Sequence, residues 1–230
     1  MEKTLTPRRV EIAGLTTVEF PAPDGAPTIV IFHGYGADGA DLAPLAMELR
    51  LPKPARWLFP DAPTELEWGG RAWFPIDAAR IQQSQATGKP VDLADSDPKR
   101  LEGARTSVSA FLAELGVPWP KLILGGFSQG AMLATDLSLS APENPRGLAI
   151  LSGNLINAAR WKELAPNRRG LPFFMSHGSV DPILGFAGAL KLETLLTDAG
   201  LQGSLLKFEG GHAIPPEVAD GLTRFLAGLV

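Results

Sequence analysis

The chain has 230 residues, of which 45% are hydrophobic, and this is enough apolar material for one sizeable core. Its 21 basic and 25 acidic residues give a formal net charge of -4, so we expect no nucleic acid among its partners. The chain contains no cysteine, which excludes disulfides, a thiolate nucleophile and cysteine-ligated metals. Any covalent catalysis must therefore use an oxygen or nitrogen nucleophile.

The first fourteen residues lack the apolar region of a signal peptide, and no run approaches the ~18 apolar residues that a membrane span needs. These features predict no membrane span and a cytoplasmic location. No linker and no internal repeat divides the chain, so we expect a single domain over residues 1–230.

Short apolar runs alternate with longer segments of helical period, which is typical of an α/β protein with a mostly parallel sheet and helices on both faces. An opening antiparallel pair is predicted at residues 10–13 and 17–20, around a turn that contains Gly14. Six further strands are predicted at residues 28–32, 57–59, 122–124, 148–151, 173–175 and 205–208. Helices are predicted at residues 42–49, 98–115, 131–139, 186–199 and 216–229.

The segment at residues 77–96 is rich in Gln, Ser, Thr and Asp and has little periodicity. It is long for a connection inside a compact domain, and such segments often act as lids. A solvated surface loop is the alternative, and the sequence does not decide between the two.

An apolar strand runs into the pattern Gly-x-Ser-x-Gly within residues 122–130, LILGGFSQG, and a predicted helix follows directly. In this context a nucleophilic serine occupies a sharp, strained turn between strand and helix. Gly126 and Gly130 are needed because side chains at these positions would collide inside the turn. The pattern therefore predicts Ser128 as a nucleophile beside a helix N-terminus, which favours a developing negative charge.

A serine hydroxyl needs a neighbouring imidazole as general base, and the chain has three histidines. His33 precedes the serine and follows the third predicted strand, where we expect it to hold a loop in shape. His177 lies only four residues before Asp181, on the loop where the acid of the site is expected. His212 follows the last predicted strand, in a glycine-rich loop, and is therefore the predicted base.

Asp181 follows a late strand in the sequence HGSVDP and is predicted to orient His212. Alone, an Asp-Pro pair would indicate only a turn. The chain order Ser128, Asp181, His212 is the order of the α/β-hydrolase fold and differs from the orders of chymotrypsin and subtilisin.

An oxyanion hole needs two backbone amides, one of which comes from the residue after the nucleophile. That residue is Gln129. The second amide is predicted in the glycine-rich loop at residues 33–36, at Tyr35, with Gly34 as the alternative. Phosphate binding by this loop is disfavoured, because the loop has neither G-x-G-x-x-G nor a Lys-Ser/Thr ending.

These motifs resemble the phospholipase/carboxylesterase family, which includes acyl-protein thioesterases and small bacterial carboxylesterases. The segments that carry the resemblance are FHGYG (32–36), RAWF (71–74), LGGFSQGAMLA (124–134), LSG (151–153), HGSVDPI (177–183) and GGHAIPPEV (210–218). The resemblance implies an α/β-hydrolase fold with an eight-stranded sheet and no large cap domain. It also implies a triad of Ser128, Asp181 and His212, the amides of Tyr35 and Gln129 as the oxyanion hole, and no cofactor or metal. The same resemblance is compatible with a homodimer.

Some positions depart from the family pattern. Tyr35 stands where a leucine is common, and Pro75 stands where relatives often carry an aspartate. These departures concern acyl specificity and leave the reaction type unchanged. Trp73, Phe74 and Leu184 are predicted to line an apolar pocket around the acyl chain, with core packing as the alternative for Trp73 and Phe74.

Together the motifs predict a serine hydrolase that cleaves small-molecule esters or thioesters with small to medium acyl chains through an acyl-enzyme. Acyl transfer or perhydrolysis, a peptidase with the same triad, and a noncatalytic binding module with this fold are the alternatives. Because the base must be neutral, activity should fall as the pH drops through about 6 to 7, where imidazole becomes protonated.

Overall fold

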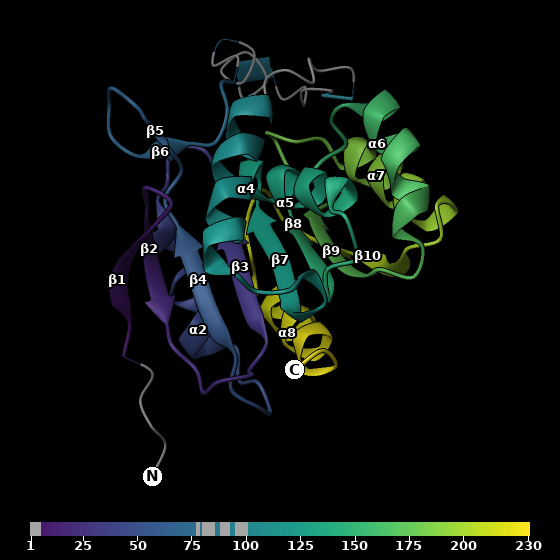
Figure 1. The fold of residues 1–230 in the computed structure, drawn as a ribbon. Helices are drawn as coiled ribbons and strands as arrows, with labels where there is room; N and C mark the ends of the chain where they lie inside the picture. The colour runs from purple at the N-terminus through teal and green to yellow at the C-terminus, as the bar shows by residue number, and fades with distance from the viewer. Residues whose placement is uncertain (1–5, 77–78, 80–85, 88–92, 95–100) are drawn as a thin grey trace.

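An eight-stranded sheet forms the centre of the molecule (Figure 1). The computed structural model describes residues 6–76, 79, 86–87, 93–94 and 101–230. The sheet has the order β1-β2-β4-β3-β7-β8-β9-β10, in which β2 is antiparallel to both of its neighbours and all other neighbouring strands are parallel. The strands are β1 (Arg8–Ile12), β2 (Leu15–Phe20), β3 (Thr28–Phe32), β4 (Arg56–Pro60), β7 (Leu122–Phe127), β8 (Gly147–Leu151), β9 (Pro172–Gly178) and β10 (Gln202–Phe208). All eight predicted strands are confirmed.

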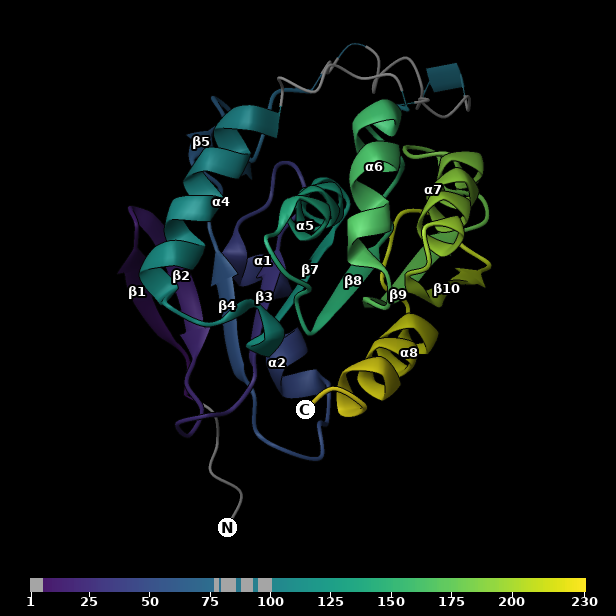
Figure 2. The ribbon, with the colours of Figure 1, turned by 45° about the vertical axis from the view of Figure 1, so that its right-hand side comes forward.

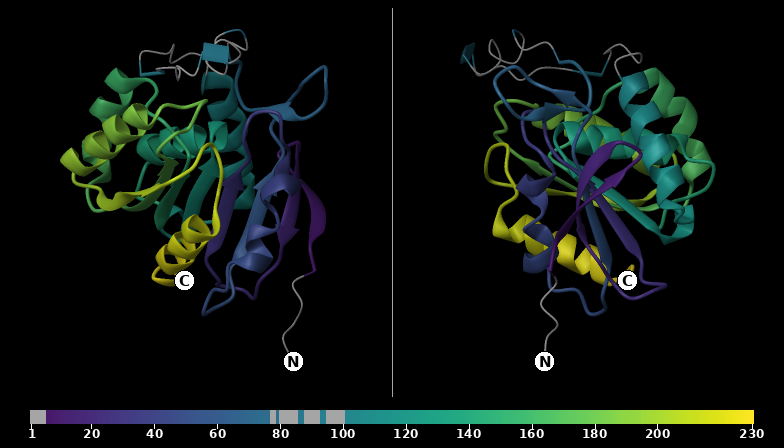
Figure 3. Two further views of the ribbon diagram at one scale, coloured as in Figure 1. Left: turned by 180° about the vertical axis from the view of Figure 1, so that it is seen from behind. Right: turned by 60° about the vertical axis from the view of Figure 1, so that its left-hand side comes forward.

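Helices cover both faces of the sheet (Figures 2 and 3). One face carries α4 (Glu102–Leu115), α5 (Gln129–Ser140), α6 (Ala158–Leu164) and α7 (Phe186–Asp198). The other face carries α1 (Gly39–Leu42), α2 (Leu45–Glu48) and α8 (Pro216–Ala227). Within the described ranges, none of the helices is long and apolar enough to cross a membrane.

Two apolar cores result, one on each side of the sheet. Alternate side chains of β3 serve both, because Val30 and Phe32 belong to the core under α4 to α7, whereas Ile29 and Ile31 belong to the core under α1, α2 and α8. All of β3 is buried. This two-sided burial explains why the central parallel strands have uninterrupted apolar sequences.

Helix α5 is buried from residue 129 to residue 139, between the sheet and the neighbouring helices. Asp136 on α5 is fully buried, and its carboxylate accepts hydrogen bonds from Arg105 Nε at 2.7 Å and from Trp161 Nε1 at 2.9 Å. A buried carboxylate is strongly destabilising unless it is paired in this way. These bonds therefore tie α4 and α6 to the helix that follows the predicted nucleophile.

Some elements differ from the prediction. The helix predicted at residues 42–49 is confirmed only in part, since α2 covers residues 45–48 and a separate short helix, α1, ends at Leu42, with Pro44 between the two. Proline has no N–H to continue a helical ladder, which explains the break. Helix α6 and a short hairpin of β5 (Thr64–Glu65) and β6 (Arg71–Ala72) were not predicted. The predicted start of α4 at Pro98 and most of the segment at residues 77–96 lie outside the described residues.

Candidate active site

Ser128 occupies a strained turn between β7 and α5. Its backbone has φ 54° and ψ -115°, a conformation that residues with a side chain seldom adopt. A Cβ atom on Gly126 would overlap the backbone of Gly130, and a Cβ atom on Gly130 would overlap the carbonyl oxygen of Phe32. Both glycines of the motif are therefore required by the close approach of backbone segments, in agreement with the sequence interpretation.

Replacing Gly130 with alanine should destabilise the fold by at least about 3 kcal/mol, because the new methyl group meets backbone that cannot move aside as a side chain can. Urea unfolding measures this loss. Gly103→Ala is the matched control, since among the described residues outside its chain neighbours and its own helix backbone nothing lies within 4 Å of the added carbon on helix α4. There we expect stabilisation by about 0.5 to 1 kcal/mol. Equal unfolding midpoints for Gly130→Ala and wild type would contradict the tight turn.

His212 and Asp181 form a hydrogen-bonded pair, with 2.6 Å between His212 Nδ1 and Asp181 Oδ2. An ionised carboxylate only accepts hydrogen bonds, so the proton lies on Nδ1 and Nε2 is left as the acceptor. The ring of Phe127, the residue before Ser128, lies 4.7 Å from the His212 ring, centroid to centroid. The structure thus brings this pair to the strained turn, in the tautomer that a general base for a serine hydroxyl requires.

The carboxylate of Asp181 is buried and strongly hydrogen-bonded. Its Oδ1 accepts the amides of Ile183 at 2.8 Å and Leu184 at 2.9 Å, while Oδ2 lies 3.3 Å from His177 Nε2 as well as facing His212. Burial by itself would raise the pKa of Asp181, but the hydrogen bonds from the two histidines and the Leu184 amide outweigh it and hold this pKa well below its ordinary value. The carboxylate therefore stays ionised throughout the neutral range.

The loops that carry the acid and the histidine lie directly against each other. A Cβ atom on Gly178, at the end of β9, would overlap the carbonyl oxygen of Gly210. The hydroxyl of Ser152, after β8, donates to the carbonyl oxygen of Ala213 at 3.4 Å, next to His212. The ends of β8, β9 and β10 thus position the imidazole together, as expected where the carboxyl ends of parallel strands meet at one edge of a sheet.

The glycine-rich loop after β3 lies beside the predicted nucleophile. A Cβ atom on Gly34 would lie 3.6 Å from the Cβ atom of Ser128. The buried ring of His33 accepts the Ala62 amide at Nε2, at 3.0 Å, and its Nδ1 donates to the carbonyl oxygen of Gly34 at 2.7 Å. Burial lowers the pKa of His33, which keeps the ring neutral in this role. Among the residues that the structure describes, the Tyr35 N–H donates to no acceptor.

The three residues predicted to line the acyl pocket are largely covered by protein. Exposed fractions are 2% for Trp73, 7% for Phe74 and 2% for Leu184. All three belong to the core under α4 to α7. Their pocket role stays a prediction. What the structure adds is a set of polar contacts through their backbones, because Leu184 binds Asp181 and the other two bind Gln129.

The side chain of Gln129 was missed by the sequence reasoning, which used only its backbone amide. Its Oε1 accepts the Trp73 amide at 2.8 Å, and its Nε2 donates to the carbonyl oxygen of Phe74 at 2.7 Å. No local pattern predicts a contact between residues this far apart in the chain. The contact of Asp181 with the Ile183 amide is different, because an aspartate that binds the backbone two residues ahead is a known turn motif and could have been read from the sequence.

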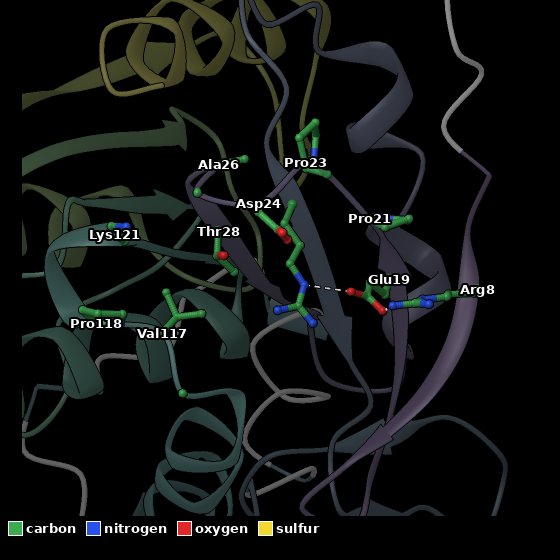
Figure 4. A pocket seen from close by; sticks show the side chains of 14 residues that line it. Arg8, Glu19, Pro21, Pro23, Asp24, Ala26, Thr28, Val117, Pro118 and Lys121 are labelled. Atoms are coloured by element: carbon green, nitrogen blue, oxygen red, sulfur yellow. Dashed lines mark hydrogen bonds and ion pairs between the residues drawn. The ribbon is translucent and has the colours of Figure 1, made fainter.

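A hollow of about 360 Å³ lies at the opposite edge of the sheet, near the starts of β3 and β4 (Figure 4). The buried Glu19 accepts hydrogen bonds there from Arg8 at 2.8 Å and Arg56 at 2.7 Å. Burial opposes ionisation of Glu19, yet the two arginines together lower its pKa. None of the predicted site residues lines this hollow, and its polar groups hold β1, β2 and β4 together.

An eight-stranded, mostly parallel sheet, a serine on a strained strand-to-helix turn and a histidine-aspartate pair at the same edge define an α/β-hydrolase. A model of the Phospholipase/Carboxylesterase family matches residues 13–229. The chain belongs to the phospholipase/carboxylesterase family.

Individual relatives agree with this assignment. The chain is 30% identical over 211 residues to acyl-protein thioesterase 1 of Eremothecium gossypii, covering 86% of this chain and 85% of that protein. It is 29% identical over 233 residues to a probable carboxylesterase of Oryza sativa subsp. japonica, covering 93% of this chain and 84% of that protein. The crystal structure of esterase PE8 has 29% identity and a TM-score of 0.79, covering 96% of this chain and all (100%) of that one. The protein is therefore a hydrolase of the class that cleaves esters and thioesters.

Proposed function

We propose that Ser128, His212 and Asp181 act as a catalytic triad that hydrolyses carboxylic esters and thioesters through an acyl-enzyme. The observation that supports this most directly is the strained serine between two indispensable glycines, together with a histidine held at 2.6 Å by an ionised aspartate. A strained backbone of this kind persists only where the surrounding structure enforces it, and it clusters at reactive sites.

In the first half of the proposed reaction, His212 Nε2 takes the proton of Ser128 Oγ as the oxygen attacks the carbonyl carbon. The amides of Tyr35 and Gln129 stabilise the oxyanion, and the imidazolium then protonates the leaving alkoxide or thiolate. In the second half, water takes the place of the serine hydroxyl and releases the acid. Asp181 keeps the Nδ1 proton in place throughout. The proposed reaction uses no cofactor.

Substrates follow from the relatives, which are named as acyl-protein thioesterases and carboxylesterases. We extend both substrate types to this chain, as small-molecule esters and thioesters with small to medium acyl chains. An uncharged ester suits a site in which the nearby histidine His33 is kept neutral by burial.

A fluorophosphonate probe followed by mass spectrometry of the digested protein tests the proposal. A single adduct on Ser128 is expected, because only an activated serine attacks phosphorus at a useful rate. A panel of p-nitrophenyl esters and acyl thioesters of increasing chain length then measures kcat/KM for each substrate type. An unlabelled Ser128 in folded protein would exclude the proposed mechanism, and activity restricted to amides would exclude the proposed substrates.

A further inference from the structure

Trp73, just after β6, joins segments that are far apart in the chain. Its backbone N–H donates to Gln129 Oε1 at 2.8 Å, and its indole Nε1 donates to the carbonyl oxygen of His33 at 3.0 Å. Gln129 Nε2 completes the pairing by donating to the carbonyl oxygen of Phe74 at 2.7 Å. The amide side chain of Gln129 thus binds one donor and one acceptor on the backbone of two successive residues. All of these polar groups are buried.

The two ends of this connection carry the two amides assigned to the oxyanion hole. Gln129 supplies one amide and is itself held by Trp73. At the other end, Trp73 holds the His33 carbonyl, and the His33 ring binds the carbonyl oxygen of Gly34 at 2.7 Å. That carbonyl and the Tyr35 N–H belong to the same peptide group, which is planar, so fixing the direction of one fixes the direction of the other.

The Trp73 side chain is committed to these protein contacts. Its ring packs edge-on against Phe32, at 5.2 Å and 82°, and it lies over the His33 ring at 5.2 Å. With 2% of the residue exposed, little of the indole is left to meet a substrate. Breaking either hydrogen-bonded end would leave a buried polar group without a partner, which the site could relieve only by shifting its backbone.

We propose that Trp73 and the Gln129 side chain form a strut that sets the separation and direction of the two oxyanion-hole amides. Trp73 is then a positioning residue for the transition state and not a wall of the acyl pocket. The inference rests on the proposed function, which places the oxyanion between the Tyr35 and Gln129 amides.

Two substitutions break the strut at different points. Trp73→Phe removes the indole N–H and keeps an aromatic ring, while Gln129→Met removes both side-chain hydrogen bonds and keeps the backbone amide. A lost oxyanion donor lowers kcat by ~10² to 10³, so for a displaced donor we expect a loss of about 10-fold to 100-fold in kcat with KM changed less than about twofold. The kcat of the double variant should be no lower than that of the less active single variant, because both substitutions break the same connection.

A trifluoromethyl ketone provides a direct measure of the oxyanion site. Ser128 Oγ adds to its carbonyl carbon, the serine proton passes to His212, and the carbonyl oxygen becomes an oxyanion in the hole. The affinity of this inhibitor should fall by the same factor as kcat in both single variants, since both report binding of the tetrahedral state.

Trp161→Phe is the matched control. Trp161 is fully buried and its indole N–H is also hydrogen-bonded, to Asp136 at 2.9 Å, but it lies on α6 and its partner on α5 is seven residues after Gln129. We expect Trp161→Phe to lower Tm about as much as Trp73→Phe does. Its kcat and its affinity for the inhibitor should be unchanged.

Two results would overturn the strut. One is that Trp73→Phe, like Trp161→Phe, lowers Tm but leaves kcat and inhibitor affinity unchanged. The other is that the KM of Trp73→Phe rises with the acyl chain length of the substrate while its kcat is unchanged, which would make Trp73 a pocket wall. If either Trp73→Phe or Gln129→Met does not fold, the kcat, KM and inhibitor affinity of the other variant test the proposal. Failure of the wild-type protein to react with a fluorophosphonate would instead reject the proposed function itself.

Discussion

Replacing Ser128 with alanine is expected to lower kcat by about 10⁴-fold to 10⁶-fold for every ester and thioester that the wild-type protein cleaves. The loss is this large because the covalent route disappears, and only binding and the oxyanion hole remain to assist attack by water. Initial rates with p-nitrophenyl esters measure the loss, and intact-mass analysis after fluorophosphonate treatment should find no adduct on the variant.

Ser138→Ala is the matched control for this substitution. Ser138 lies on the same helix α5, is buried, and its hydroxyl has no hydrogen-bond partner in the described part of the chain. Its removal should leave kcat and probe labelling at wild-type levels. Residual activity of Ser128→Ala above about 1% of wild type, at an unchanged Tm, would place the nucleophile elsewhere.

Asp181→Asn is expected to lower kcat by about 10⁴-fold with little change in the fold. The Ile183 and Leu184 amides both donate to Oδ1, so the asparagine oxygen must stay there as their acceptor. Its NH₂ group then faces His212 Nδ1, where a carboxylate oxygen accepted a proton before. His212 must move its proton to Nε2 to avoid two opposed donors, and in that tautomer it cannot accept the proton of Ser128.

The dependence of activity on pH tests whether Asp181 stays ionised while it orients His212. The pKa of Asp181 is depressed, so its contribution to stability is fully present above the ordinary unfolded value, is unchanged at pH 5 to 8, and is lost only as the pH falls through the lower folded value. The fall in wild-type activity that the sequence predicts below neutral pH should therefore not come from protonation of Asp181. Asp198→Asn, on the exposed end of α7, should leave rate and profile unchanged. A near-normal rate for Asp181→Asn would remove the aspartate from the mechanism.

Much of the fold could be predicted from the sequence because its rules act over a few residues. Apolar runs bounded by turns indicated all eight strands, and each of the five predicted helices overlaps a helix that the structure describes. The helix predicted at residues 42–49 starts later in the structure, because Pro44 has no N–H to bind the carbonyl oxygen of α1 and stands instead as the N-cap of α2. Helix α6 and the β5–β6 hairpin are too short to carry a clear periodicity.

The sequence by itself determined the local chemistry: a serine between glycines where a buried strand becomes a helix, and an order of serine, aspartate and histidine that this fold shares. Only the tertiary structure decided that the Gln129 side chain grips the backbone of Trp73, and that the Trp73 indole turns toward the His33 carbonyl. The physical reason is the range of the forces involved. Steric limits on a turn depend on adjacent residues, whereas hydrogen bonds between loops depend on how the whole sheet brings its strand ends together.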